Sequence, residues 1–93
     1  MIHVRELIWD DWNVAHMARH AVTRLEVEEV CQGEHVVLEG YGGRLVFVGP
    51  TAAGRMIAAV LDPLDEDGVF YPITARPAAR KERRIYQEAK QGE

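Results

Sequence analysis

The chain has 93 residues, of which 47% are hydrophobic and 28% charged, and its formal net charge at pH 7 is −4. This length and composition predict one globular domain, residues 1–93, and they exclude disordered, fibrous and multidomain proteins. No apolar run approaches the roughly 20 residues of a membrane span, and the first residues lack the charged-then-apolar order of a signal peptide. The lone Cys31 cannot form an internal disulfide, so we expect a soluble, cytoplasmic protein without membrane partners.

The N-terminal segment predicts a strand followed by a helix. Residues 2–9 are rich in Ile, Val, Leu and Trp, which is typical of a buried strand. Asp10 and Asp11 then offer an N-cap and a favourable charge for a helix that reaches about His20. We expect Trp12 to anchor this helix to the sheet.

A second helix is predicted directly after the first. Thr23 and Glu26 have the spacing of a capping box, in which the hydroxyl and the carboxylate each accept a backbone N–H of the first turn. Gly33 is expected to end this helix. The side chains expected to face the core are Leu25, Val27 and Val30.

From residue 34 onward the hydrophobic pattern becomes extended. Four predicted strands lie at residues 35–39, 44–48, 55–61 and 69–75. Glycine-rich hairpin turns at residues 40–43 and 49–54 connect the first three strands, which predicts an antiparallel meander. Pro72 favours an edge or bulged position for the last strand, because proline cannot donate to a ladder.

A last helix is predicted to begin near Pro77, which suits a first helical turn. The order is therefore β-α-α-β-β-β-β-α. A run of strands after a run of helices predicts an α+β fold, with an antiparallel sheet of four to five strands and helices packed on one face.

The last helix carries most of the positive charge. Residues 76–93 contain six of the eleven Lys and Arg residues against three acids, whereas residues 1–75 contain five against twelve. Arg76, Arg80 and Arg84 are spaced four apart, which predicts one ridge of a helix. Each such pair of like charges costs about 0.2–0.5 kcal/mol unless an anion offsets it. The ridge predicts a surface for an anion, with phosphate favoured; a solvated face neutralised by the protein's own acids is the alternative.

The histidines and tryptophans are open to two interpretations each. His16 and His20 have the spacing of two zinc ligands on a helix, but position 17 is Met and no third ligand follows, so we expect no metal site. His20 stands beside Arg19 and suits proton transfer if the fold brings it near the last helix. Trp12 is interpreted as structural, with stacking on a nucleobase as the alternative.

Four segments carry a family resemblance that spans nearly the whole chain. They are Leu7–Asn13, Arg19–Thr23 before a Glu-rich helix, Gly54–Val60, and Ile73–Arg76 together with Ala79–Tyr86. They resemble the BrnT family, the small toxins of type II toxin–antitoxin modules. The resemblance implies a RelE-like fold and a ribonuclease that needs no metal or other cofactor. The chain departs from the family pattern at Asn13, where the family usually has Lys, and at Ala21, where it has Gly.

If the resemblance extends to activity, a ribose 2′-OH attacks the adjacent phosphate. That step needs a base, cations for the developing charge, and an acid for the leaving oxygen. The candidate catalytic residues are Arg76 and Arg80 for charge stabilisation, Glu82 or His20 as base, and Tyr86 or His20 as acid. Further phosphate contacts are expected from Arg55, Arg83 and Arg84.

The resemblance also implies two partners. One is an RNA substrate and the other is a cognate antitoxin, itself a small DNA-binding protein; a homo- or hetero-oligomer is compatible with this arrangement. The alternative function is a non-catalytic binding module, a diverged toxin relative whose basic last helix binds an antitoxin or a nucleic acid.

Overall fold

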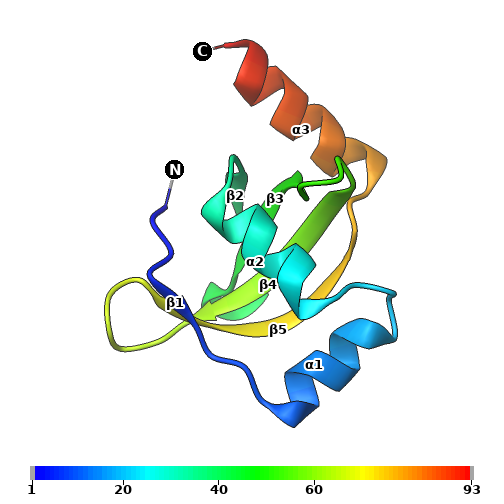
Figure 1. Ribbon diagram of the computed structural model, residues 1–93. Coiled ribbons are helices and arrows are strands. Elements are labelled where there is room, and N and C mark those ends of the chain that lie inside the picture. The colour runs from blue at the N-terminus through cyan, green and yellow to red at the C-terminus, as the bar shows by residue number, and fades with distance from the viewer. Residues whose placement is uncertain (1, 93) are drawn as a thin grey trace.

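A computed structural model describes residues 2–92 (Figure 1). The elements in chain order are β1 (Glu6–Leu7), α1 (Asp11–Ala18), α2 (Arg24–Gln32), β2 (Val36–Glu39), a 3-10 turn (Tyr41–Gly43), β3 (Leu45–Pro50), β4 (Met56–Pro63), β5 (Val69–Pro77) and α3 (Arg80–Gln91). The predicted order of helices and strands is confirmed, and so is the α+β class.

The strands form one five-stranded sheet in the order β1-β5-β4-β3-β2. Strands β2 to β5 are antiparallel neighbours, as the glycine-rich turns predict, but β1 runs parallel to β5. The expectation of a wholly antiparallel sheet is therefore wrong at this edge. No hairpin joins β1 to a neighbour, because α1 and α2 follow it and carry the chain across to β2, so its direction is not set by a turn.

Strand β5 contains the bulge that Pro72 favoured. Its pairing with β4 passes from Val60 opposite Thr74 to Leu61 opposite Pro72, which leaves Ile73 without a partner on β4. A bulge of this kind lets the sheet accommodate a residue that lacks a backbone N–H. The predicted position of Pro72 is confirmed, and its side chain is fully buried.

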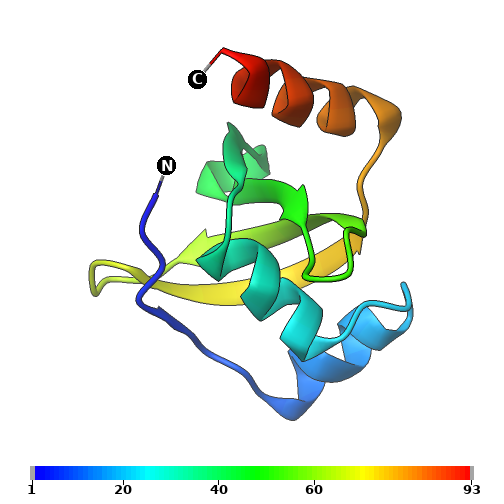
Figure 2. The same cartoon turned by 45° about the horizontal axis from the view of Figure 1, so that its top comes forward.

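Helices cover both faces of the sheet, as Figure 2 shows, with α1 and α2 on one side and α3 on the other. Side chains alternate along each strand, so Phe47 and Ala59 lie in the core beneath α2, while Val48 and Ala58 pack with Tyr86 of α3. The expectation that all helices pack on one face is wrong. Apolar side chains on both faces of β3 and β4 give α3 its own surface to cover.

Both N-terminal helices begin with reciprocal caps. Asp10 and Asn13 exchange two hydrogen bonds of 2.9 Å, and the Asn13 side chain donates a third to the Ile8 carbonyl at 3.0 Å. Asn13 is fully buried, and these bonds offset the cost of burying its amide. The predicted capping box of Thr23 and Glu26 is confirmed, with backbone bonds of 3.0 and 3.2 Å.

Two expected core residues lie at the surface instead. Trp12 is 56% exposed and Leu25 is 66% exposed. In α1 the cap turns Asn13 and Met17 inward, so Trp12 points to solvent. Trp9 is the tryptophan that packs against the core, and its indole N–H donates to Glu28 Oε1 at 2.8 Å.

The last helix begins later than predicted. Pro77 ends β5 opposite Ile57, and the Ala78 N–H continues the ladder by donating to the Met56 carbonyl at 2.9 Å. The residue before a proline is restricted to extended conformations, which favours continuation of the strand over a helix start. Helix α3 therefore starts at Arg80. No helix within residues 2–92 has both the length and the apolar character that crossing a membrane requires.

Candidate functional site

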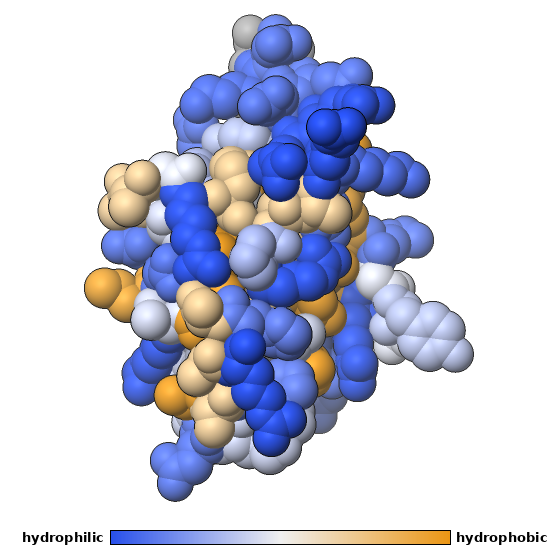
Figure 3. Space-filling model, turned by 90° about the vertical axis from the view of Figure 1, so that its right-hand side faces the viewer, coloured by the Kyte–Doolittle hydropathy of each residue, from blue (hydrophilic) through white to orange (hydrophobic). Residues whose placement is uncertain are grey.

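The first five residues of α3 carry four cations. Arg80, Lys81, Arg83 and Arg84 are all exposed, and we call these four residues the α3 cationic turn. Figure 3 shows this side of the molecule, with strongly hydrophilic side chains crowded over the upper part, where α3 lies. Among residues 2–92, no ion pair reaches Arg80, Lys81 or Arg84, so these three charges face solvent.

Glu82, the one acid inside this turn, is already engaged. Both of its oxygens accept from the Arg76 guanidinium, at 2.7 and 2.8 Å, and Oε1 also accepts from the Ala79 N–H at 2.8 Å. Arg76 donates from β5, so the expectation of a helical ridge of Arg76, Arg80 and Arg84 is wrong in its first member. The hydrogen bonds from Arg76 hold the pKa of Glu82 below its usual range, and Glu82 in turn raises the pKa of Arg76. Glu82 is therefore ionised at neutral pH and a weak base in this state.

Tyr86 lies one turn after Glu82 on the sheet-facing side of α3. Its ring is buried with Val48 and Ala58, and its hydroxyl donates to Glu34 Oε2 at 3.3 Å. Lys90 Nζ lies 3.2 Å from the same Glu34 oxygen. The pKa of Glu34 is lowered, chiefly by Lys90. Tyr86 thus anchors α3 to the start of β2.

Arg55 belongs to a second group of residues, on the face of the sheet covered by α1 and α2. Its Nη1 donates to the Ala21 carbonyl at 2.7 Å and to both oxygens of Glu26 at 3.1 Å. The Thr23 backbone and Arg55 together hold the pKa of Glu26 below its usual range, with the backbone bond as the larger cause. Arg55 therefore links the start of β4 to the start of α2.

His20 lies in the turn that closes α1, and it is exposed. The Val22 N–H donates to the Met17 carbonyl at 3.2 Å and the Ala21 N–H donates to the Ala18 carbonyl at 3.0 Å. This pair of bonds is a Schellman motif, which requires a left-handed residue, and Ala21 supplies it with φ 56°. Ala21 thus occupies a position that glycine, which has no Cβ, would fill with less strain.

The predicted site residues fall into these two groups. Arg76, Glu82 and Tyr86 follow one another between the end of β5 and the sheet-facing side of α3, and Arg80 starts the same helix. Arg55 and His20 lie on the other face of the sheet, joined through Ala21. Glu26 was not predicted as the partner of Arg55, although its capping-box position was a visible signal for an acid fixed in place. The pairing of Arg76 with Glu82 agrees with the alternative in which the protein's own acids neutralise the basic segment.

The exposed surface of α1 carries a row of aromatic rings. The Trp12 and His16 rings are stacked, with centroids 4.9 Å apart and planes at 10°. His20 meets His16 edge-on, with centroids 6.1 Å apart. The sequence indicated the four-residue spacing of the two histidines but not the exposure of Trp12, which depends on the rotation of α1.

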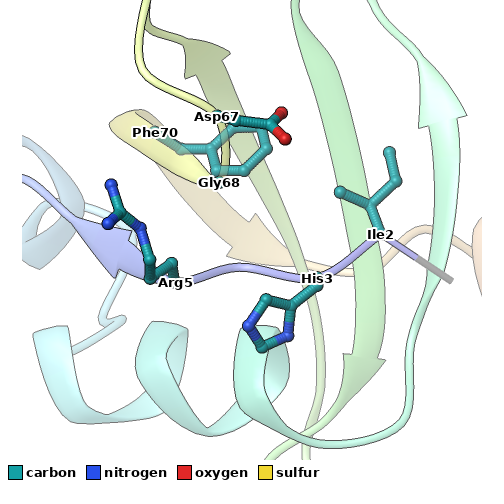
Figure 4. A pocket seen from close by; sticks show the side chains of 6 residues that line it. All are labelled: Ile2, His3, Arg5, Asp67, Gly68 and Phe70. Atoms are coloured by element: carbon teal, nitrogen blue, oxygen red, sulfur yellow. The ribbon is translucent and has the colours of Figure 1, made fainter.

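The hollow beside β1 has about 370 Å³ of space and is lined by Ile2, His3, Arg5, Asp67, Gly68 and Phe70. In Figure 4 the charged groups of Arg5 and Asp67 point away from one another, and His3 points to the opposite side of the N-terminal segment. Arg5 is paired with Glu66. These side chains do not converge on a common ligand position, so the α3 cationic turn is the stronger candidate site.

No protein-family model and no curated protein matches this chain. Within residues 2–92, no three His, Cys, Asp or Glu side chains are grouped closely enough to hold a metal ion. The function therefore has to be argued from the geometry described above.

Proposed function

We propose that this protein binds RNA through the α3 cationic turn, as the RNA-directed member of a toxin–antitoxin pair. The observation that carries the proposal is the presence of four exposed cations within residues 80–84, while the only acid among them is held by Arg76. RNA phosphates are the polyanion that such a surface attracts most strongly, since each contact releases condensed counterions.

The arrangement is unfavourable for the free helix, which supports a binding role. Arg80 and Arg84 repel at a four-residue spacing, and cations in a first turn oppose the helix dipole, each at a cost of about 0.3–1 kcal/mol. A phosphate beside this turn removes both penalties. Arg80, Lys81 and Arg84 have no ion-pair partner within residues 2–92, which is consistent with a surface kept for a ligand.

Binding is better supported than cleavage. Arg76 and Arg55, two cations of the catalytic hypothesis, already bind the protein's own carboxylates. His20 lies on the opposite face of the sheet from Glu82 and Tyr86, so it is not placed to exchange a proton at the same phosphate. We propose that the cognate antitoxin neutralises the protein by placing acidic side chains against the α3 cationic turn, in competition with RNA.

The binding proposal is tested by fluorescence anisotropy with a labelled single-stranded RNA over a range of salt concentrations. The double variant Arg80→Gln/Arg84→Gln should bind the RNA more weakly. The slope of log K against log salt should become less negative by about 1.4, since each phosphate contact on a single strand contributes about −0.7. The matched control is Arg5→Gln/Arg44→Gln, which changes the net charge equally at exposed positions outside α3. If both double variants lost RNA affinity equally, the α3 cationic turn would not be a specific binding surface.

Metal-independent RNA cleavage is the second candidate, favoured by the succession of Arg76, Glu82 and Tyr86 at the end of β5 and along α3. In this mechanism an incoming phosphate would draw Arg76 away from Glu82, whose pKa would then rise toward the range of a useful base. Tyr86 would have to leave Glu34 before its hydroxyl could supply the proton to the leaving oxygen, and Arg80 would stabilise the charge on phosphorus.

Incubation with mixed-sequence RNA in EDTA tests this second candidate. Cleavage that is lost in Arg76→Ala, reduced in Arg76→Lys and retained in Arg44→Gln would support it, because lysine lacks the two-pronged donor of arginine. Absence of cleavage by every folded, RNA-binding preparation would leave binding as the function.

A further inference from the structure

The aromatic row of α1 has the composition of a surface that stacks nucleobases. Trp12, His16, Arg19 and His20 follow one stripe of α1 and its closing turn, at helical spacings of four, seven and eight residues from Trp12. Trp12 is 56% exposed and stacked on His16 through one ring face. More than half of the surface of Trp12 is open to solvent, and the stripe contains an arginine but no acid.

A structural role does not account for this stripe. The core-facing residues of α1 are Asn13 and Met17, and the indole that seals the core is that of Trp9. Trp12 is therefore not one of the residues that α1 buries in the core. Leaving about half of an indole in water forfeits part of the burial that a tryptophan can supply.

The end of the stripe lies on the same side of the molecule as the α3 cationic turn. His20 precedes Ala21, whose carbonyl accepts from Arg55; Arg55 precedes Met56, whose carbonyl accepts from Ala78, and α3 starts two residues later. Figures 1 and 2 place the end of α1 and the start of α3 on the same side of the molecule. A single strand that binds the cations of α3 can therefore continue along this side to α1.

We infer that the exposed face of Trp12 is a stacking platform for an unpaired base of a single-stranded RNA whose phosphates bind the α3 cationic turn. The inference rests on the proposed function and adds its substrate class. Stacking needs a base whose face is free, so a strand with accessible bases is selected over a duplex. The two rings behind the platform, His16 and His20, fix its orientation.

The test compares an oligoadenylate with an abasic strand of equal length, which has the same phosphates and no bases. Trp12→Ala should weaken binding of the oligoadenylate by about 5- to 150-fold, the range that alanine substitution gives for a stacked base, and leave the abasic strand unchanged. Trp12→Phe should restore most of the loss. Arg80→Gln/Arg84→Gln should weaken both strands alike.

A second measurement uses the unsubstituted platform, so it does not depend on how the Trp12 variant folds. In Trp9→Phe, Trp12 is the only indole of the chain, and its emission should be quenched by the oligoadenylate but not by the abasic strand. If the α3 variant loses affinity while Trp12→Ala binds both strands normally and no quenching occurs, the platform is refuted and RNA binding stands. If neither strand binds the unaltered protein, the proposed function itself fails.

Discussion

Ala21→Gly should stabilise this protein, although it replaces the better helix former with the poorer one. Ala21 closes α1 in the left-handed region, with φ 56°, where a Cβ atom costs about 1–2 kcal/mol. Glycine removes that cost but adds freedom to the unfolded chain, which offsets about 0.4–1 kcal/mol. The net expectation is a gain of about 0.5–1 kcal/mol, or roughly 2–8 °C in Tm for a domain of this size.

Urea unfolding followed by tryptophan fluorescence measures this gain, with an unchanged m-value expected because the surface exposed on unfolding is the same. Ala15→Gly is the matched control, since Ala15 is exposed inside α1 where the backbone is helical. The free energy of unfolding of Ala15→Gly should fall by about 1 kcal/mol. Opposite signs for the two variants would support the assignment of Ala21, whereas equal losses would refute it.

Three further predictions concern Gly49, Glu82 and Cys31. Gly49→Ala should destabilise the protein by about 1–3 kcal/mol in the same assay, because a Cβ on Gly49 would clash with the Glu34 carbonyl and the backbone there cannot yield easily. Glu82→Gln should tighten RNA binding by releasing Arg76, and the slope of log K against log salt should become more negative by about 0.7. It should also flatten the acid limb of the stability curve: the lowered pKa of folded Glu82 contributes stability that is present above the unfolded pKa of about 4.3 and lost as pH falls through the folded pKa. Burial raises the pKa of Cys31 to about 12, so iodoacetamide at pH 8 should modify it only after urea unfolding; rapid labelling of the native protein would contradict its buried position.

The predictions that succeeded rest on local signals. In a capping box, two side chains three residues apart accept each other's backbone N–H groups at the start of a helix. This signal predicted the start of α2 from Thr23 and Glu26. Glycine-rich turns between short β-branched runs define hairpins, which located β2, β3 and β4 within two residues of their observed bounds. These features involve neighbours in the chain, and their energies do not depend on the rest of the fold.

The candidate site followed the sequence less closely, because the position of each side chain depends on contacts between distant segments. The cationic composition of the last helix was visible, and the exposure of its first turn agrees with it. The specific pairing of Arg76 with Glu82 was not visible, because the four-residue spacing placed Arg76 on a helix, whereas it lies in β5 and the helix starts at Arg80. Likewise, Arg55 binds Ala21 and Glu26 across 34 and 29 residues.

What the sequence alone determined is therefore the list of elements, their order and the charge of the last helix, all of which arise from interactions within a few residues. The tertiary structure decided which face each helix covers, the direction of β1 and the rotation that leaves Trp12 in water. It also separated Arg55 and His20 from Arg76, Glu82 and Tyr86. Those outcomes depend on how both apolar faces of one sheet are covered at once, which is a property of the whole chain and of no segment within it.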